Sequence, residues 1–287
     1  MVDDRVTIVV ATRDRLADLE RSLPRHEAPV IVVDNGSGDG TVAAVRRSHP
    51  EVDVVEIGTN RGATARNVGV ARASTRYVAF ADDDSWWAPG AVALAADVLD
   101  AHRGVAVLAA RVLVGEDGRL DPVCSEMAAS PLGRRSDLPG PPIQGFVACG
   151  AVVRRDAFLD VGGFDDVVFF DGEEERVALD LSAAGWDLVY VPEVVAHHHP
   201  SPVRDREGRR ALAVRNRLLV AVLRRPWPVV GRQALQALRG GRAARSGLRA
   251  AVPRLPRALA GRRRLPDPVE VARSRLDRRT SDGRESS

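Results

Sequence analysis

Four short apolar runs in the first third of the chain each lead into a polar segment, and this pattern constrains the fold most. The runs are rich in β-branched and aromatic side chains and cover residues 6–10, 30–33, 52–57 and 77–80. Helical stretches are predicted between them, at about residues 16–23 and 41–48. Strands that alternate with helices form a mainly parallel sheet with helices on both faces. The sequence therefore predicts an α/β fold class, with ligands bound beyond the carboxyl ends of the strands.

Three adjacent carboxylates, Asp82, Asp83 and Asp84, follow the fourth run. Carboxylates at the end of a buried strand repel one another and are costly to desolvate, and a divalent cation removes that cost. Side chains alternate along an extended chain, so Asp82 and Asp84 share one face and can bind one ion. Oxygen ligands of this kind suit Mg²⁺ or Mn²⁺. A solvated acidic turn is the alternative interpretation of the run taken by itself.

Length and composition indicate one large domain with an appendage and a cytoplasmic location. The chain has 287 residues, of which 45% are hydrophobic. Its charged first residues lead straight into a strand, so no signal peptide is expected. No apolar run approaches the roughly 20 residues that span a bilayer. The two cysteines, Cys124 and Cys149, have no metal-ligand spacing and are expected to be buried free thiols in a reducing compartment.

Further motifs occur in order along about residues 5–202, namely 6–15, 32–37, 60–62, 65–67, Asp82-x-Asp84, 162–165, 172–174 and the histidines after Pro192. In order and spacing this set resembles the family 2 glycosyltransferases, a large group of inverting enzymes with the GT-A fold. The resemblance implies a GT-A fold, with its Rossmann-like sheet. It also implies that Asp82 and Asp84 hold a metal ion on the diphosphate of a nucleotide sugar.

The resemblance also implies which residues bind the nucleotide. Thr12 and Asp34 match contacts to the base and ribose, and Arg13 is a further nucleotide-sugar-binding candidate. Arg66 matches a contact to the nucleotide half of the donor, and Asp83 matches a ribose contact. Two alternatives follow from the residue types alone. Asp34 is suited to capping its own turn-rich loop. Arg66 is suited to a solvated helix surface.

The acidic triplet after Gly172 supplies the expected catalytic base, which the resemblance assigns to Glu174. Helix geometry supports this choice, because Glu174 shares a face with three apolar residues at spacings of three, four and seven, Val177, Ala178 and Leu181. Glu173 is expected to point outward or to support the site indirectly. The alternative for the whole triplet is stabilisation of a helix N-terminus by acidic side chains.

Three consecutive histidines near residue 198 are the remaining candidates for metal binding. Family members place a metal-binding histidine here, so the resemblance implies a ligand among them. In an extended segment His197 and His199 face one way and His198 faces the other. We predict that His197 or His199 is the ligand. A polar strand end is the alternative.

The chemistry predicted from these residues is inverting sugar transfer. A cation neutralises the leaving diphosphate, and one carboxylate takes the proton of the incoming hydroxyl. The expected donor is a UDP- or dTDP-linked sugar, and the expected acceptor is a glycan or a lipid-linked intermediate of cell-envelope synthesis. A sugar-phosphate nucleotidyltransferase is one alternative, but residues 11–15 lack the Gly-rich phosphate loop that such enzymes place after the first strand. An inactive nucleotide-sugar-binding scaffold is another.

The C-terminal part differs in charge from the rest. Residues 204–264 contain 18 Arg and only two acidic residues. We predict a glycosyltransferase domain at 1–203, an Arg-rich helical extension at 204–264 and a disordered tail at 265–287. A basic, partly amphipathic segment suits the anionic inner face of a membrane. Nucleic-acid binding is not predicted, because no aromatic interleaving or known motif accompanies the charge.

Overall fold

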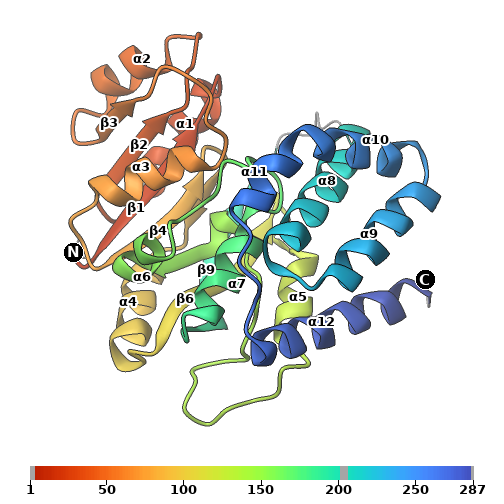
Figure 1. The fold of residues 1–287 in the computed structure, drawn as a ribbon. Coiled ribbons are helices and arrows are strands. Elements are labelled where there is room, and N and C mark those ends of the chain that lie inside the picture. Colours follow the sequence, from red (N-terminus) through yellow and green to blue (C-terminus); the bar gives the residue numbers. More distant parts are fainter. Residues whose placement is uncertain (1–3, 201–205, 286–287) are drawn as a thin grey trace.

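A nine-stranded mixed sheet forms the centre of the computed structural model, which describes residues 4–200 and 206–285 (Figure 1). Its strand order is β3-β2-β1-β4-β8-β6-β9-β5, with β7 added beside β6. The first four strands run parallel and are β1 (Val6–Thr12), β2 (Val30–Asp34), β3 (Asp53–Glu56) and β4 (Tyr77–Asp82). The predicted α/β class is confirmed, and the carboxyl ends of β1 and β4 lie side by side.

The second half of the sheet brings distant segments to the end of β4. Its strands are β5 (Ser85–Trp87), β6 (Val105–Val114), β7 (Arg119–Leu120), β8 (Ala151–Arg154) and β9 (Asp187–His198). Strand β8 is antiparallel to β4 and β6, whereas β9 is parallel to β6. Strand β5 pairs with the end of β9, with Ser85 opposite His198. This pairing places the histidines next to the acidic run.

Helices cover both faces of the sheet, because alternate strand side chains are apolar on both sides. Val9 and Phe80 belong to one buried cluster and Ile8 and Ala79 to the other. The first cluster packs under α3 (Thr64–Arg72), α5 (Pro122–Ala128), α6 (Arg155–Asp160) and α7 (Glu173–Ala183). The second packs under α1 (Leu16–Ser22), α2 (Thr41–Ser48) and α4 (Ala91–Ala101). Burial on both faces explains the continuous apolar runs of the strands.

A helical lobe, residues 206–285, packs beside α7 (Figure 1). It contains α8 (Arg206–Arg224), α9 (Trp227–Arg239), α10 (Arg242–Ala251), α11 (Leu255–Ala260) and α12 (Asp267–Glu285). A third buried cluster joins Leu179 of α7 to Leu219 of α8. The predicted boundary between residues 203 and 204 lies outside the described residues.

Helix α12 occupies Asp267–Glu285, where the sequence predicted a disordered tail at 265–287, and residues 286–287 lie outside the described residues. Its Glu270 carboxylate accepts two hydrogen bonds from Arg225, at 2.6 and 2.8 Å, and Arg273 pairs with Glu175 of α7 at 3.0 Å. Arg225 is only 1% exposed, so its charge needs acidic partners. The polar composition of the segment suggested disorder. The ion pairs that hold the helix could not be predicted, because their partners lie far away in the sequence.

Candidate active site

A cavity of about 640 Å³ opens beyond the carboxyl ends of β1 and β4. It collects residues from the sheet, from the start of α7 and from the helical lobe, namely Ala11, Arg15, Arg66, 82–84, 146–149, 170–174, His198 and Arg209. Five of the predicted site carboxylates, Asp82, Asp83, Asp84, Glu173 and Glu174, therefore line one cavity. Thr12, Arg13 and Asp34 are not among the described residues that line it.

The acidic run turns sharply between β4 and β5 and concentrates negative charge. Asp84 is 8% exposed. Burial, and then the charges of Asp82 and Asp84, raise the pKa of Asp83 to about 7. Arg15 partly balances this charge, at 3.7 Å from Asp83 Oδ1 and 3.5 Å from Asp84 Oδ2. Sequence reasoning missed Arg15, whose only signal was its place in the loop after β1.

Arg66 is buried, 6% exposed, and lies between the acidic run and the start of α7. Its Nη2 donates to Asp82 Oδ1 at 2.5 Å, and its Nη1 is 3.6 Å from Glu173 Oε1. Burial by itself would lower the pKa of Arg66, but the charges of Asp82 and Glu173 outweigh it and raise the pKa. Arg66 is therefore a charged cavity residue and not a solvated helix residue, and its contact with the nucleotide stays a prediction.

Glu174 points into the cavity from the first turn of α7, as its apolar neighbours predicted. Val177, Ala178 and Leu181 are all fully buried. The Glu174 Oε1 atom accepts a hydrogen bond from Ala148 N at 3.2 Å. Burial, and then the charge of Glu173, raise the pKa of Glu174 to about 8. The arrangement gives a held carboxylate with a high proton affinity, which suits a general base.

Glu173 corrects part of the prediction, because it does not point outward. It is 3% exposed and faces Arg66. Helix geometry predicted that Glu173 and Glu174 lie on different faces of the helix. It could not reveal that Arg66, on another helix, lies beside Glu173. An indirect supporting role for Glu173, the other half of that prediction, stays a prediction.

The loop before α7 is held in an unusual backbone conformation from two sides. Phe169 and Asp171 both have φ of 73°. On one side Ala63 N donates to Phe169 O at 2.7 Å, and a Cβ on Gly62 would lie 2.4 Å from that oxygen. On the other side Asn216 of α8 donates to the carbonyls of Phe170 and Asp171. The helical lobe therefore helps to position the segment that leads into Glu174.

His198 is the histidine that reaches the acidic run, which corrects the prediction of His197 or His199. Its Nε2 is 3.4 Å from Asp84 Oδ1. His197 and His199 lie on the opposite face of the strand end, with ring centroids 5.6 and 4.6 Å from that of Trp86. The alternation was predicted correctly. Only the pairing of β5 with β9 decides which face meets the cavity.

Thr12 contacts the cavity lining through Asp83, and neither Arg13 nor Asp34 is among the described residues that line the cavity. Thr12 Oγ1 donates to Asp83 Oδ2 at 3.1 Å, and Arg13 is half-exposed beside Asp14. Asp34 Oδ2 caps its own loop by accepting from the main-chain N–H of residues 36 and 37, at 3.2 and 3.1 Å. Its buried Oδ1 has no hydrogen-bond partner among the described residues. Their nucleotide contacts stay predictions.

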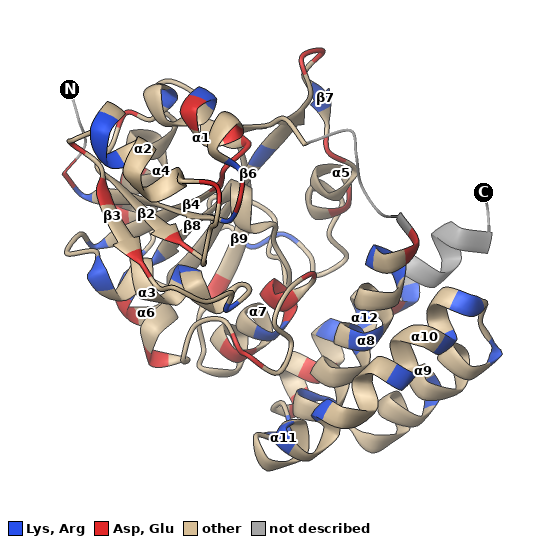
Figure 2. Cartoon of the chain, turned by 90° about the horizontal axis from the view of Figure 1, so that it is seen from above, with Lys and Arg blue, Asp and Glu red and all other residues tan. Residues whose placement is uncertain are grey.

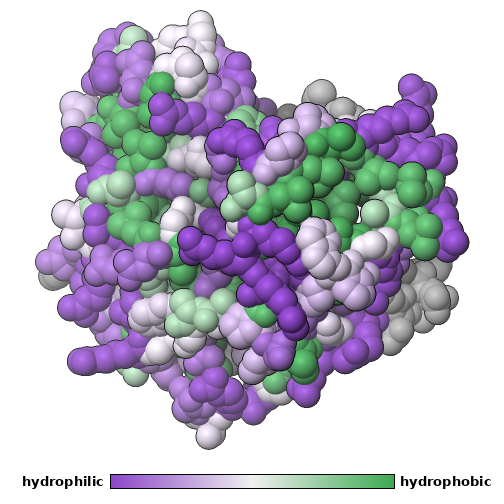
Figure 3. All heavy atoms as spheres, in the orientation of Figure 1, coloured by the Kyte–Doolittle hydropathy of each residue, from purple (hydrophilic) through white to green (hydrophobic). Residues whose placement is uncertain are grey.

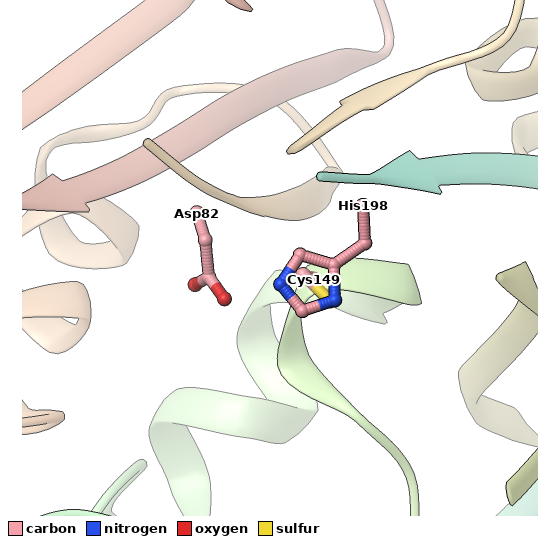
Figure 4. A group of neighbouring side chains, drawn as sticks. All are labelled: Asp82, Cys149 and His198. Atoms are coloured by element: carbon pink, nitrogen blue, oxygen red, sulfur yellow. The ribbon is translucent and has the colours of Figure 1, made fainter. Parts of the chain in front are cut away.

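The donor set fits a divalent cation. Ligand atoms of Asp82, Cys149 and His198 lie within 4.8 Å of one another and point into a common space (Figure 4). Asp84 adds a carboxylate beside His198. Carboxylate and imidazole ligands in this number can hold Mg²⁺, Mn²⁺ or Zn²⁺. The crowded carboxylates also give a physical reason for a cation to bind there, because it would relieve their repulsion.

Comparison of the chain with known proteins identifies its family. The family described as Glycosyl transferase family 2 matches residues 7–162, more than half of the chain. A pre-mycofactocin glycosyltransferase of Mycobacterium tuberculosis is 32% identical over 223 residues, which are 72% of this chain and 45% of that protein. The chain therefore spans about half the length of that relative. An N-acetylglucosaminyl-diphospho-decaprenol L-rhamnosyltransferase of the same species is 26% identical over 253 residues, covering 75% of this chain and 82% of that protein.

Solved structures agree on the architecture. A mannosyltransferase from Pyrobaculum calidifontis, PcManGT, in complex with GDP-Man and Mn²⁺ has a TM-score of 0.58 and 25% identity, covering 91% of this chain and 76% of that chain. S. aureus TarS in complex with UDP-GlcNAc has a TM-score of 0.60 and 15% identity, covering 93% of this chain and 83% of that chain. With its α/β sheet and this match over residues 7–162, the chain belongs to glycosyl transferase family 2 and has the GT-A fold.

Proposed function

We propose that this chain is a metal-dependent inverting glycosyltransferase that moves a sugar from a nucleotide-diphosphate donor to a hydroxyl group. One observation carries the proposal. A cation-type donor set, Asp82, Asp84 and His198, shares a cavity with Glu174, a partly buried carboxylate whose pKa is raised to about 8. Sugar transfer needs both functions in one place, since the leaving diphosphate and the attacking hydroxyl meet at the same carbon.

The residues divide the work as follows. A divalent cation held by Asp82, Asp84 and His198 would neutralise the diphosphate of the donor. Glu174 accepts the proton of the acceptor hydroxyl, and the bond from Ala148 N holds one carboxylate oxygen in place. Arg66 holds Asp82 and Glu173 in fixed positions through one contact to each carboxylate. A single base suffices because inversion takes one displacement.

The names of related proteins support the substrate class. The mannosyltransferase structure holds GDP-Man with Mn²⁺, and the TarS structure holds UDP-GlcNAc. The rhamnosyltransferase is named for a diphospho-decaprenol, a lipid-linked acceptor. For this chain we propose a UDP- or dTDP-linked donor and a glycan or lipid-linked acceptor of cell-envelope synthesis. The cation is proposed to be Mg²⁺ or Mn²⁺.

A thermal-shift screen followed by an activity assay tests this function. We expect UDP or dTDP to raise the melting temperature only when Mn²⁺ or Mg²⁺ is present, because a cation held by Asp82, Asp84 and His198 would neutralise the diphosphate beside the carboxylates. Incubation of the matching nucleotide sugar with a cell-envelope lipid extract should then yield a glycoside. An activated sugar formed from sugar phosphate and nucleoside triphosphate would instead support the nucleotidyltransferase alternative. Binding without any product would support the scaffold.

The helical lobe carries the features of a peripheral membrane surface, and we propose that it contacts anionic lipid. Its exposed side chains include large apolar ones, namely Trp227, Leu235, Leu238, Val252 and Leu259. Figure 3 shows hydrophobic residues gathered over this lobe, and Figure 2 shows Arg distributed along its helices. Within residues 4–200 and 206–285, no helix has the length and apolar character needed to cross a bilayer. Surface binding would bring the site close to a lipid-linked acceptor.

Replacing Leu235 and Leu238 together by Ser should weaken binding to phosphatidylglycerol vesicles about tenfold or more. These leucines are 44% and 57% exposed on one face of α9, and inserting each into lipid is worth roughly 1 kcal/mol or more. Co-sedimentation measures the effect. Leu94→Ser on α4, where the leucine is 39% exposed, is the matched control. Equal binding by all three proteins would remove the proposal. Truncation is unsuitable, because α8 contributes Leu219 to the core.

A further inference from the structure

Cys149 lies at the candidate cation site although its sequence spacing predicted an inert thiol. It occupies a short 3-10 turn, Ala148–Gly150, directly before β8, and is 2% exposed. Its Sγ is within 4.8 Å of ligand atoms of both Asp82 and His198 (Figure 4). The turn has little freedom to move, because a Cβ on Gly150 would lie 2.5 Å from Val112. The thiol is therefore held at the acidic run.

The other cysteine shows what an ordinary buried thiol looks like in this fold. Cys124 Sγ accepts a hydrogen bond from Val112 N at 3.2 Å and lies 3.9 Å from Ala110 O. It belongs to an apolar cluster under α5. The hydrogen bonds of the described residues include none from the Cys149 thiol. Instead Cys149 lines the cavity together with the charged residues Asp82 and Asp84.

We infer that Cys149 is a sulfur ligand for thiophilic divalent cations, so that this cavity binds Zn²⁺, Co²⁺ or Cd²⁺ through Asp82, Cys149 and His198. One carboxylate oxygen, one imidazole nitrogen and one sulfur would supply three of the four ligands of the tetrahedral coordination that Zn²⁺ favours. Soft thiolate ligands select such ions over Mg²⁺ and Mn²⁺, which prefer oxygen. The inference rests on the proposed function only in that both use the same cation site.

The two kinds of cation would use the cavity differently. Coordination by sulfur requires the thiolate, so each bound Zn²⁺ or Co²⁺ releases the Cys149 proton to solvent and no electron is transferred. Mn²⁺ or Mg²⁺ would use the oxygens of Asp82 and Asp84 and leave the thiol protonated. Thiophilic ions would thus be held by the protein more tightly than the ions proposed for the reaction. They are expected to displace Mn²⁺ and to inhibit transfer.

Absorption of the Co²⁺-loaded full-length protein tests the sulfur contact without any activity assay. Wild-type protein should show a sulfur-to-cobalt charge-transfer band in the near ultraviolet. Cys149→Ser should lose the band, and the matched control Cys124→Ser should keep it. A second measurement monitors the displacement of Mn²⁺ by Zn²⁺, using the electron paramagnetic resonance signal of the freed Mn²⁺. The Zn²⁺ concentration that displaces Mn²⁺ should be roughly tenfold or more lower for wild type than for Cys149→Ser.

Three results would overturn the inference, namely no charge-transfer band in wild type, an unchanged band in Cys149→Ser, or equal displacement of Mn²⁺ in both proteins. Mn²⁺ binding itself and the melting temperature show whether the variant is folded. Cys149→Ala, which adds no polar group to a buried turn, replaces Cys149→Ser if the latter unfolds. Nucleotide binding with Mn²⁺ in wild type tests the proposed function separately, so either idea can fail while the other stands.

Discussion

Glu174→Gln is expected to lower turnover by roughly a hundredfold or more, the usual effect of removing a positioned base. The amide keeps the size and polarity of the side chain and can still accept the hydrogen bond from Ala148 N, but it cannot take a proton. Donor binding should barely change, because the proposed cation ligands lie elsewhere, at the end of β4, in the turn after it and on β9. Product formation at saturating donor and acceptor measures the effect.

Glu175→Gln is the matched control for this substitution. Glu175 pairs with Arg273 at 3.0 Å on the lobe side of α7, so its loss should leave turnover within a few-fold of wild type. Near-normal turnover of Glu174→Gln, or greater damage from Glu175→Gln, would show that a different carboxylate is the base.

The same substitution should stabilise the fold at high pH. The pKa of Glu174 is raised from 4.5 to about 8, so the folded chain holds this proton more tightly than the unfolded chain. The free energy of unfolding of the wild type should therefore fall as pH rises from about 4.5 towards about 8, and Glu174→Gln should escape this loss. The variant should gain roughly 1–3 kcal/mol at pH 8 and nothing at pH 4. Metal-free denaturation curves at both pH values measure the difference.

Asp84→Asn is expected to abolish cation-dependent binding of a nucleotide diphosphate while the protein stays folded. Asp84 is 8% exposed and lies 3.4 Å from His198, so its carboxylate would hold the proposed cation, which would supply the positive charge that the diphosphate needs. Removing one of three crowded negative charges relieves repulsion and should not lower the melting temperature of the metal-free protein. Calorimetric titration of UDP or dTDP with Mn²⁺ measures the loss.

His198→Ala and His199→Ala form a matched pair for the same experiment. His198 is the last residue of β9 and its ring faces the Asp84 carboxylate, whereas the ring of His199 packs against Trp86 and His199 meets Asp84 through its main-chain N–H. His198→Ala should weaken Mn²⁺-dependent binding at least about tenfold, and His199→Ala should leave it unchanged. Unaltered binding in Asp84→Asn, or a larger loss in His199→Ala than in His198→Ala, would mean that the cation sits elsewhere.

The sequence pattern by itself predicted the sheet, the position of the acidic run and the direction of Glu174, because each of these depends on residues that are close together in the chain. Apolar runs alternating with helices predicted the parallel sheet, because strands buried on both faces must be apolar throughout. The position of Asp82 at the end of β4 followed from the end of such a run. The inward direction of Glu174 followed from the helical repeat, which is set within two turns of α7.

Tertiary structure decided every feature that depends on contacts between distant segments. Strand alternation separates His198 from its two neighbours, but only the pairing of β5 with β9 turns His198 to the acidic run. Arg15 and Cys149 became candidates for the site because the sheet brings their loops to the end of β4. Arg225 orders α12 by burying a charge that needs Glu270, 45 residues further along. Such contacts depend on three-dimensional placement, so no periodicity in the chain could reveal them.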